Sequence, residues 1–206
     1  MKLIVFFNGW GMDNKAVDHL IIPKNYEVKI VNFPYDLDSS IFKNYEDVIA
    51  IGWSFGSYYL CKYLNYNNIK LDKVISINGV PETIGEFGIP ERIFEATLKN
   101  LTPETLKEFY HNMGVDSENL FSNRNFQEIK AELQYFKDNY SPEKNVFSKV
   151  FIGKKDRIIP ALRQEKYYNR HNIEVSIIQC PHYSFNFFKS WLDIICLLYT
   201  SDAADE

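Results

Sequence analysis

Six short apolar runs constrain the fold of this chain more than any other feature of its sequence. Most of the runs are continuous rather than alternating, which is typical of strands buried on both faces of a parallel sheet. They are Leu3–Phe7, Val28–Asn32, Val48–Ile51, Val74–Ile77, Val150–Ile152 and Val175–Ile178. Helical patterns lie between most of them. This alternation predicts a doubly wound α/β fold, with a mostly parallel central sheet and helices on both faces.

Three helices are predicted to follow strands directly. One starts after Gly56, and another spans Ala161–Asn169 behind Pro160, a residue that the start of a helix tolerates. A third is expected after Asp13, which can cap a helix that carries Ala16, Val17, Leu20 and Ile21.

Residues 81–145 break the alternation, because they contain three helical patterns and no convincing strand. The first carries Ile93, Phe94, Leu98 and Leu101. The second is capped by Thr102, begins at Pro103 and carries Leu106, Phe109, Tyr110 and Met113. The third carries Phe126, Ile129, Leu133, Phe136 and Tyr140. We interpret this segment as a helical cap, about 81–145, over the carboxyl ends of the strands. The core is then 1–80 and 146–195 of a single domain, 1–195.

Bulk composition narrows the classes of function. The chain has 206 residues, of which 46% are hydrophobic and 24% charged, as in an ordinary globular domain. A formal net charge of -4 gives no basic footprint for nucleic acid. No apolar run reaches the roughly 18 residues of a membrane helix. Three cysteines without a CxxC motif indicate a reducing cytoplasm rather than a disulfide framework.

The last residues, 196–206, have no periodicity and resemble a translated sequencing adapter. We predict that they are a non-native tail and exclude them from the fold.

The stretch Gly52-Trp53-Ser54-Phe55-Gly56 lies between a predicted strand and a predicted helix. A GxSxG pattern alone is weak evidence, and its simplest interpretation is a turn. In this setting it predicts a nucleophile elbow, where glycines permit a tight bend and the serine points out of it. Ser54 is therefore the candidate nucleophile, and it needs a neighbouring base and an orienting acid.

Three histidines follow Ser54, and one of them comes directly after a predicted strand. His111 falls inside a cap helix and His171 in a polar stretch, so we interpret both as surface residues. His182 follows Val175–Ile178 and belongs to a loop at a strand end, where catalytic residues gather. It is the candidate general base.

Asp156 is the candidate acid, because it follows another strand through a short loop. α/β-Hydrolases place the triad in the order serine, acid, histidine, and the strand ends of a parallel sheet meet at one edge. The alternative is a surface aspartate paired with Lys154, Lys155 or Arg157.

An oxyanion hole needs backbone N–H groups that point to the developing negative charge. Phe55, directly after the candidate nucleophile, can supply one such group. Trp10, between two glycines in the loop 8–13, can supply the other. The alternative for this loop is a strand-to-helix turn capped by Asp13, and both interpretations can hold together.

Several motifs together carry a resemblance to a known family. They are Asn8-Gly9-Trp10-Gly11-Met12-Asp13 with Ala16–Leu20, Gly52–Gly56, Ile77-Asn78-Gly79, Gly88-Ile89-Pro90 with Ile93-Phe94-Glu95, Leu101–Leu106 and Pro181-His182-Tyr183. Over roughly residues 1–195 the chain resembles the pimeloyl-[acyl-carrier-protein] methyl ester esterases of the short BioG type. These are α/β-hydrolases of biotin synthesis.

The resemblance implies a serine carboxylesterase that acts on a pimeloyl chain linked to an acyl carrier protein. It would free the distal carboxylate from its methyl ester and release methanol. Ser54 would attack, His182 would act as general base and Asp156 would orient it, with the Trp10 and Phe55 N–H groups on the oxyanion. No metal or organic cofactor is implied. The expected enzyme is a cytoplasmic monomer that contacts neither nucleic acid nor membrane.

Two other functions remain open at this point. One is a general short-chain carboxylesterase or thioesterase with the same triad. The other is a catalytically silent hydrolase fold that serves as a binding module, although it would not need a complete triad.

The charge of the cap complicates recognition of an acidic carrier protein. Residues 81–145 contain seven Lys/Arg against twelve Asp/Glu, so a contact must use a local cluster. The candidates are Arg92, Lys99, Arg124, Lys130 and Lys137. The alternative is that these side chains are only solvated faces of the cap helices.

Overall fold

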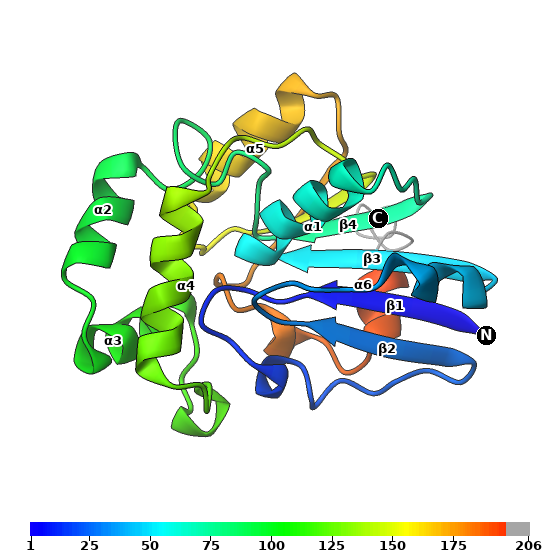
Figure 1. Ribbon diagram of the computed structural model, residues 1–206, viewed down its shortest axis with the longest axis horizontal. Helices are drawn as coiled ribbons and strands as arrows, with labels where there is room; N and C mark the ends of the chain where they lie inside the picture. The colour runs from blue at the N-terminus through cyan, green and yellow to red at the C-terminus, as the bar shows by residue number, and fades with distance from the viewer. Residues whose placement is uncertain (197–206) are drawn as a thin grey trace, which may run out of the picture.

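Six parallel strands form one sheet in the computed structural model, which describes residues 1–196 (Figure 1). Their spatial order is β2-β1-β3-β4-β5-β6, and every neighbouring pair is parallel. The strands are β1 (Lys2–Phe7), β2 (Tyr26–Val31), β3 (Asp47–Trp53), β4 (Lys73–Ile77), β5 (Lys149–Gly153) and β6 (Val175–Ile178). Each of the six predicted runs overlaps one strand, so the prediction of a parallel α/β sheet is confirmed.

Central and edge strands differ in burial. Every residue of β1 after Lys2 is buried, as is every residue of β4 after Lys73. The edge strand β2 instead alternates between partly buried and exposed residues along most of its length. No strand among residues 1–196 pairs with its outer side, and one of its faces remains open to solvent.

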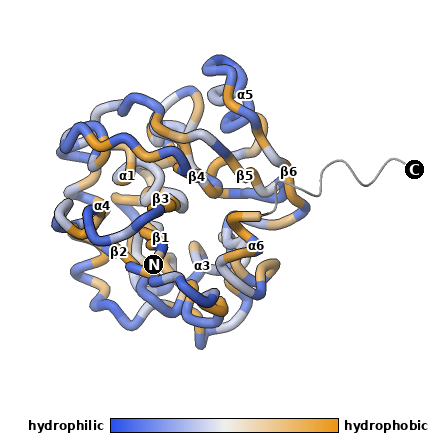
Figure 2. Tube along the Cα trace, turned by 90° about the vertical axis from the view of Figure 1, so that its right-hand side faces the viewer, coloured by the Kyte–Doolittle hydropathy of each residue, from blue (hydrophilic) through white to orange (hydrophobic). Residues whose placement is uncertain are grey.

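Helices cover both faces of the sheet. Helices α1 (Phe55–Tyr66) and α5 (Ala161–Arg170) lie on one face, and α6 (Trp191–Cys196) lies on the other (Figure 2). Both α1 and α5 match predicted helices.

Consecutive side chains of β1 show how the two faces are filled. Phe7 packs against Tyr63 of α1, with ring centroids 5.6 Å apart. Phe6 points to the opposite face and packs against Trp191 of α6 at 5.3 Å. Successive side chains of a strand point to opposite faces, so a strand that buries both must be covered on both sides. Helices α1 and α6 provide this cover for β1.

Three helices lie between β4 and β5, beyond the carboxyl ends of the strands, as Figure 1 shows at the left. They are α2 (Glu91–Lys99), α3 (Pro103–Met113) and α4 (Phe126–Asp138), and we call them the cap helices. Helix α3 begins as its sequence predicts. The Thr102 side chain accepts from the Thr105 N–H, and the Thr105 hydroxyl accepts from the Thr102 N–H.

The prediction of a helix after Asp13 is wrong. Asp13 caps only a 3₁₀ turn, Asn14–Ala16, and Ile21 is 66% exposed. The chain leaves the turn because the Ile21 backbone pairs with the start of α6. The Ile21 N–H donates to the Lys189 carbonyl at 3.0 Å, and the Trp191 N–H donates to the Ile21 carbonyl at 3.2 Å. Further 3₁₀ turns are Ser39–Asn44, Glu118–Leu120 and Phe185–Phe187.

The predicted non-native tail, 196–206, lies outside the described residues except for Cys196, which ends α6. Within residues 1–196, no helix combines the length and the apolar character needed to cross a lipid bilayer.

Candidate active site

Ser54 occupies a strained bend between β3 and α1. Its backbone has φ 56° and ψ -123°, an unusual conformation for a residue other than glycine. The flanking glycines are required by close packing. A Cβ on Gly56 would lie 2.0 Å from the Phe7 carbonyl oxygen, and one on Gly52 would lie 2.6 Å from the Ser57 Cα. This strand–bend–helix geometry is that of a nucleophile elbow.

The bend lies where the order of strands reverses. Strands β1 and β3 are neighbours, while the intervening β2 lies outside β1. The loops after β1 and β3 therefore leave the sheet side by side at its carboxyl edge. This switch point is the usual ligand-binding position in an open α/β sheet.

Asp156 and His182 form a buried pair at the same edge. The Asp156 Oδ2 lies 2.8 Å from the His182 Nδ1, and both side chains are 0% exposed. The Oδ1 of Asp156 accepts from the backbone N–H groups of Ile158 and Ile159, at 2.8 and 2.9 Å. The alternative of a solvated aspartate paired with nearby lysines is therefore wrong. The carboxylate is held by four hydrogen bonds, including one from Gln164.

The pair defines the proton arrangement of the imidazole. A carboxylate at Nδ1 favours the tautomer in which Nδ1 carries the proton and Nε2 is the acceptor. His182 Nε2 is buried and has no hydrogen-bond partner among residues 1–196. The Ser54 hydroxyl therefore forms no hydrogen bond with it in this structure. Catalytic hydrogen bonds of this kind often tighten only when substrate binds.

Asn78 positions the loop that carries His182, a role that the sequence did not reveal. Its side-chain amide donates to the His182 carbonyl at 2.8 Å and to the Pro181 carbonyl at 3.2 Å. Its Oδ1 accepts from the Gly153 N–H at 2.6 Å. Asn78 has φ 47°, a left-handed conformation that asparagine tolerates. One side chain at the end of β4 thus joins the loops of the candidate acid and base.

Gln164 is a second residue that sequence reasoning missed. From α5, its amide donates to the Asp156 Oδ2 at 3.0 Å and to the Ile159 carbonyl at 2.6 Å. The signal in the sequence is a glutamine eight residues after the acid, spaced to share a helix face with Tyr167 and Tyr168.

The loop 8–13 is held by the cap helices through its backbone and through one side chain. The Tyr110 hydroxyl of α3 donates to the Gly11 carbonyl at 2.9 Å. The Trp10 indole N–H donates to the Ile129 carbonyl of α4 at 2.9 Å. Within residues 1–196, the Trp10 and Phe55 backbone N–H groups donate to no protein acceptor. Neither candidate donor of the oxyanion hole is thus occupied by an acceptor within these residues.

A buried ion pair supports the same loop. Arg124 Nη1 lies 2.6 Å from Glu132 Oε2, with side chains 15% and 0% exposed. Glu132 Oε1 accepts from the Tyr35 hydroxyl at 3.3 Å, and that hydroxyl also donates to the Asn8 carbonyl at 3.0 Å. Burial raises the pKa of Glu132 to about 7, with Arg124 acting in the opposite direction.

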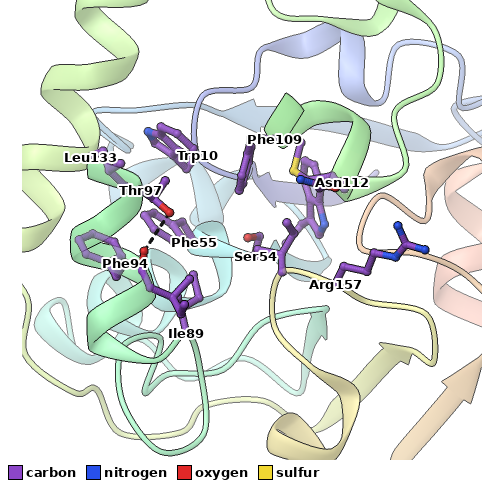
Figure 3. A pocket seen from close by; sticks show the side chains of 15 residues that line it. Trp10, Ser54, Phe55, Ile89, Phe94, Thr97, Phe109, Asn112, Leu133 and Arg157 are labelled. Atoms are coloured by element: carbon purple, nitrogen blue, oxygen red, sulfur yellow. Dashed lines mark hydrogen bonds between the residues drawn. The ribbon is translucent and has the colours of Figure 1, made fainter. Parts of the chain in front are cut away.

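Ser54 opens into a pocket of about 340 Å³ between the sheet edge and the cap helices (Figure 3). Its walls are mainly apolar, with a few polar side chains. The aromatic and aliphatic part includes Trp10, Phe55, Ile89, Ile93, Phe94, Phe109, Met113 and Leu133. The polar part besides Ser54 consists of Thr97, Asn112 and Arg157. Such a cavity fits an extended apolar chain with a polar reacting end.

The cations proposed for carrier recognition do not form one exposed cluster. Arg124 is not a free surface cation, because its side chain is only 15% exposed and pairs with the buried Glu132. Lys137 pairs with Glu95 at 2.9 Å. Lys99, Lys130 and Lys137 line a groove between α2 and α4, whereas Arg92 is not part of that groove.

The fold and the bend at Ser54 define the class of this protein as an α/β-hydrolase. A bromoperoxidase from Bacillus anthracis has the same fold, with a TM-score of 0.62 and 16% identity. The alignment covers 96% of this chain and 91% of that one.

The family is narrower than the class. Residues 1–194 match the family model described as pimeloyl-ACP methyl esterase BioG, and the chain belongs to this family. The crystal structure of BioG from Haemophilus influenzae is similar, with a TM-score of 0.82, 29% identity and 93% of each chain covered.

A longer relative is also similar in sequence. A protein of Bacteroides fragilis (strain 638R), named malonyl-[acyl-carrier protein] O-methyltransferase, is 33% identical over 201 residues. The match covers 91% of this chain but only 41% of that relative, so this chain spans less than half of its length.

Proposed function

We propose that this protein is a serine carboxylesterase that hydrolyses the methyl ester of pimeloyl-[acyl-carrier protein]. The products are the free distal carboxylate and methanol. The observation that carries the proposal is the buried Asp156–His182 pair at the carboxyl edge that also presents Ser54. Membership of the BioG family supplies the expected substrate class.

The reaction begins with Ser54 as nucleophile. As its oxygen attacks the ester carbonyl, the proton passes to Nε2 of His182. The Asp156 carboxylate, 2.8 Å from Nδ1, stabilises the imidazolium that forms. The Trp10 and Phe55 N–H groups donate to the negatively charged oxygen of the tetrahedral intermediate.

Collapse of that intermediate releases the alcohol. His182 returns its proton to the methoxide as methanol leaves, and an acyl-enzyme remains on Ser54. Water then loses a proton to His182 and attacks the acyl-enzyme. The second tetrahedral intermediate breaks down to regenerate the serine hydroxyl and release the carboxylic acid.

The pocket supports an acyl chain of several methylenes. Trp10, Phe94 and Phe109 present apolar surface beside Ser54 (Figure 3). Burial of each methylene against such walls contributes about 0.8 kcal/mol. The methyltransferase name of the Bacteroides relative does not transfer, because more than half of that relative lies outside the match.

The test is hydrolysis of pimeloyl-carrier methyl ester by the wild type and by Ser54→Ala. We expect methanol release by the wild type and a loss of several orders of magnitude in the variant. Hydrolysis of p-nitrophenyl esters without any action on the carrier ester would leave a general esterase. Failure of a fluorophosphonate probe to label the folded wild type would instead indicate a silent binding module.

A further inference from the structure

We propose that the carrier protein docks on the loop between β5 and α5, through Lys154, Lys155 and Arg157. The cap helices are then not its main electrostatic contact. The inference rests on the proposed function, since it identifies the surface that receives a protein-bound substrate.

The pocket opens beside this loop. Among the residues that line it, Ile93 of α2, Asn112 of α3 and Arg157 are exposed, so they mark its rim. The Arg157 guanidinium points away from Ser54, toward the outside of the pocket (Figure 3). An acyl chain tethered to a protein must enter through this rim while the protein stays outside. The carrier therefore lies against the elements that form the rim.

The loop presents three exposed cations without acidic partners. Lys154, Lys155 and Arg157 form no ion pair with any of residues 1–196. The acid in their midst, Asp156, is buried and bound to His182, so its carboxylate is turned away from solvent. The solvent side of this segment is thus positive on a chain whose net charge is -4. An acidic carrier protein is complementary to such a surface.

The loop is also held in place before any partner arrives. The Lys154 N–H donates to the Ile178 carbonyl at 2.8 Å, and the Lys155 N–H donates to the Cys180 carbonyl at 3.0 Å. Two further N–H groups of the loop bind the Asp156 carboxylate. Because the backbone is already fixed, docking does not add the entropy cost of ordering this loop, and within it only the long side chains lose freedom.

The cations of the cap meet these conditions less well. Arg124 is only 15% exposed and paired with Glu132, and Lys137 is paired with Glu95. Lys99 and Lys130 line the groove between α2 and α4, and no residue of that groove lines the Ser54 pocket. They provide a matched control, since they are lysines outside any ion pair in the described part of the chain.

The experiment compares the double variants Lys154→Glu/Lys155→Glu and Lys99→Glu/Lys130→Glu on two substrates. Arg157 stays unchanged because it lines the pocket. For the loop variant we expect KM for pimeloyl-carrier methyl ester to rise about tenfold and to lose most of its salt dependence. Its kcat/KM for a small methyl ester should stay at the wild-type value. The cap variant should match the wild type on both substrates.

Two kinetic results would overturn the proposal. One is a rise in KM in the cap variant but not in the loop variant. The other is an equal loss on both substrates in the loop variant, which would indicate damage to the site rather than to docking.

Equilibrium binding separates docking from turnover. Pimeloyl-carrier methyl ester is titrated against Ser54→Ala, with and without the two loop substitutions. If the wild type cleaves small esters but not the carrier ester, the proposed function is refuted. The titration still shows whether the carrier binds to the loop. Binding that weakens about tenfold supports the surface. Equal binding of both forms, or no binding by either, refutes it.

Discussion

Replacement of Arg124 with methionine is expected to destabilise the protein far more than the loss of an exposed charge. Arg124 pairs with Glu132 at 2.6 Å, and Glu132 is 0% exposed. The variant keeps an apolar stem but leaves the carboxylate buried without its cation. Breaking one side of a buried pair typically costs about 3–5 kcal/mol. For a domain of this size, that lowers Tm by roughly 6–20 °C.

Lys137→Met is the matched control. Lys137 pairs with Glu95 at a similar 2.9 Å, but the side chains are 40% and 52% exposed. Such a surface pair contributes about 0–1 kcal/mol, so urea and thermal unfolding should hardly change. Tryptophan fluorescence and far-ultraviolet circular dichroism can follow both transitions.

The pH dependence gives a second, independent readout. Burial raises the folded-state pKa of Glu132 to about 7, above its usual value of 4.5. The stability associated with its bound proton is therefore present below the unfolded pKa and is lost as pH rises through about 7. Without Arg124 the pKa rises further. Arg124→Met should thus lose more stability relative to the wild type at pH 8 than at pH 5.5.

Two results would refute this reasoning. One is a destabilisation no larger than that of Lys137→Met, and the other is an equal loss at both pH values. The double variant Arg124→Met/Glu132→Gln provides a further check. Glutamine removes the buried charge but keeps the shape of the glutamate side chain. The double variant should therefore recover part of the lost stability, and its stability should no longer differ more from the wild type at pH 8 than at pH 5.5 through Arg124.

Two further substitutions test the site geometry. Gly56→Ala should destabilise by about 3 kcal/mol in urea unfolding, because its Cβ would lie 2.0 Å from the Phe7 carbonyl oxygen. A wild-type midpoint would contradict that packing. Asn78→Asp keeps the acceptor for the Gly153 N–H but turns a carboxylate oxygen toward the His182 carbonyl. We expect kcat to fall about 10²-fold with an unchanged circular dichroism spectrum, and an unchanged kcat would rule out its positioning role.

The strands and the candidate triad could be predicted because each depends on local sequence. A short run of consecutive apolar residues, without alternating polar ones, predicts a strand buried on both faces. Strands β1, β3 and β4 are buried over most of their length. Ser54 and Asp156 each follow such a run, whereas His182 follows the partly exposed edge strand β6. Parallel topology then brings the three loops to one edge.

The parts that sequence reasoning missed depend on distant contacts. Asn78 bonds to residues 75 and 104 positions away, and nothing near it in sequence indicates those partners. Charge alone makes Arg124 a candidate for a carrier surface, but its guanidinium pairs with a buried glutamate eight residues later. The helix expected after Asp13 gives way to pairing of Ile21 with Ser190, a tertiary contact that overrides local propensity.

The hydrogen bonds to loop 8–13 divide the three cap helices into two kinds. Helices α3 and α4 cannot be exchanged as modules, because Tyr110 and the Ile129 carbonyl hold Gly11 and Trp10. Helix α2 makes none of the hydrogen bonds that join this loop to the rest of residues 1–196, yet it supplies Phe94 and Thr97 to the pocket wall. If the proposed function holds, acyl-chain preference can therefore be redesigned through α2 while the backbone of the candidate oxyanion loop keeps its position.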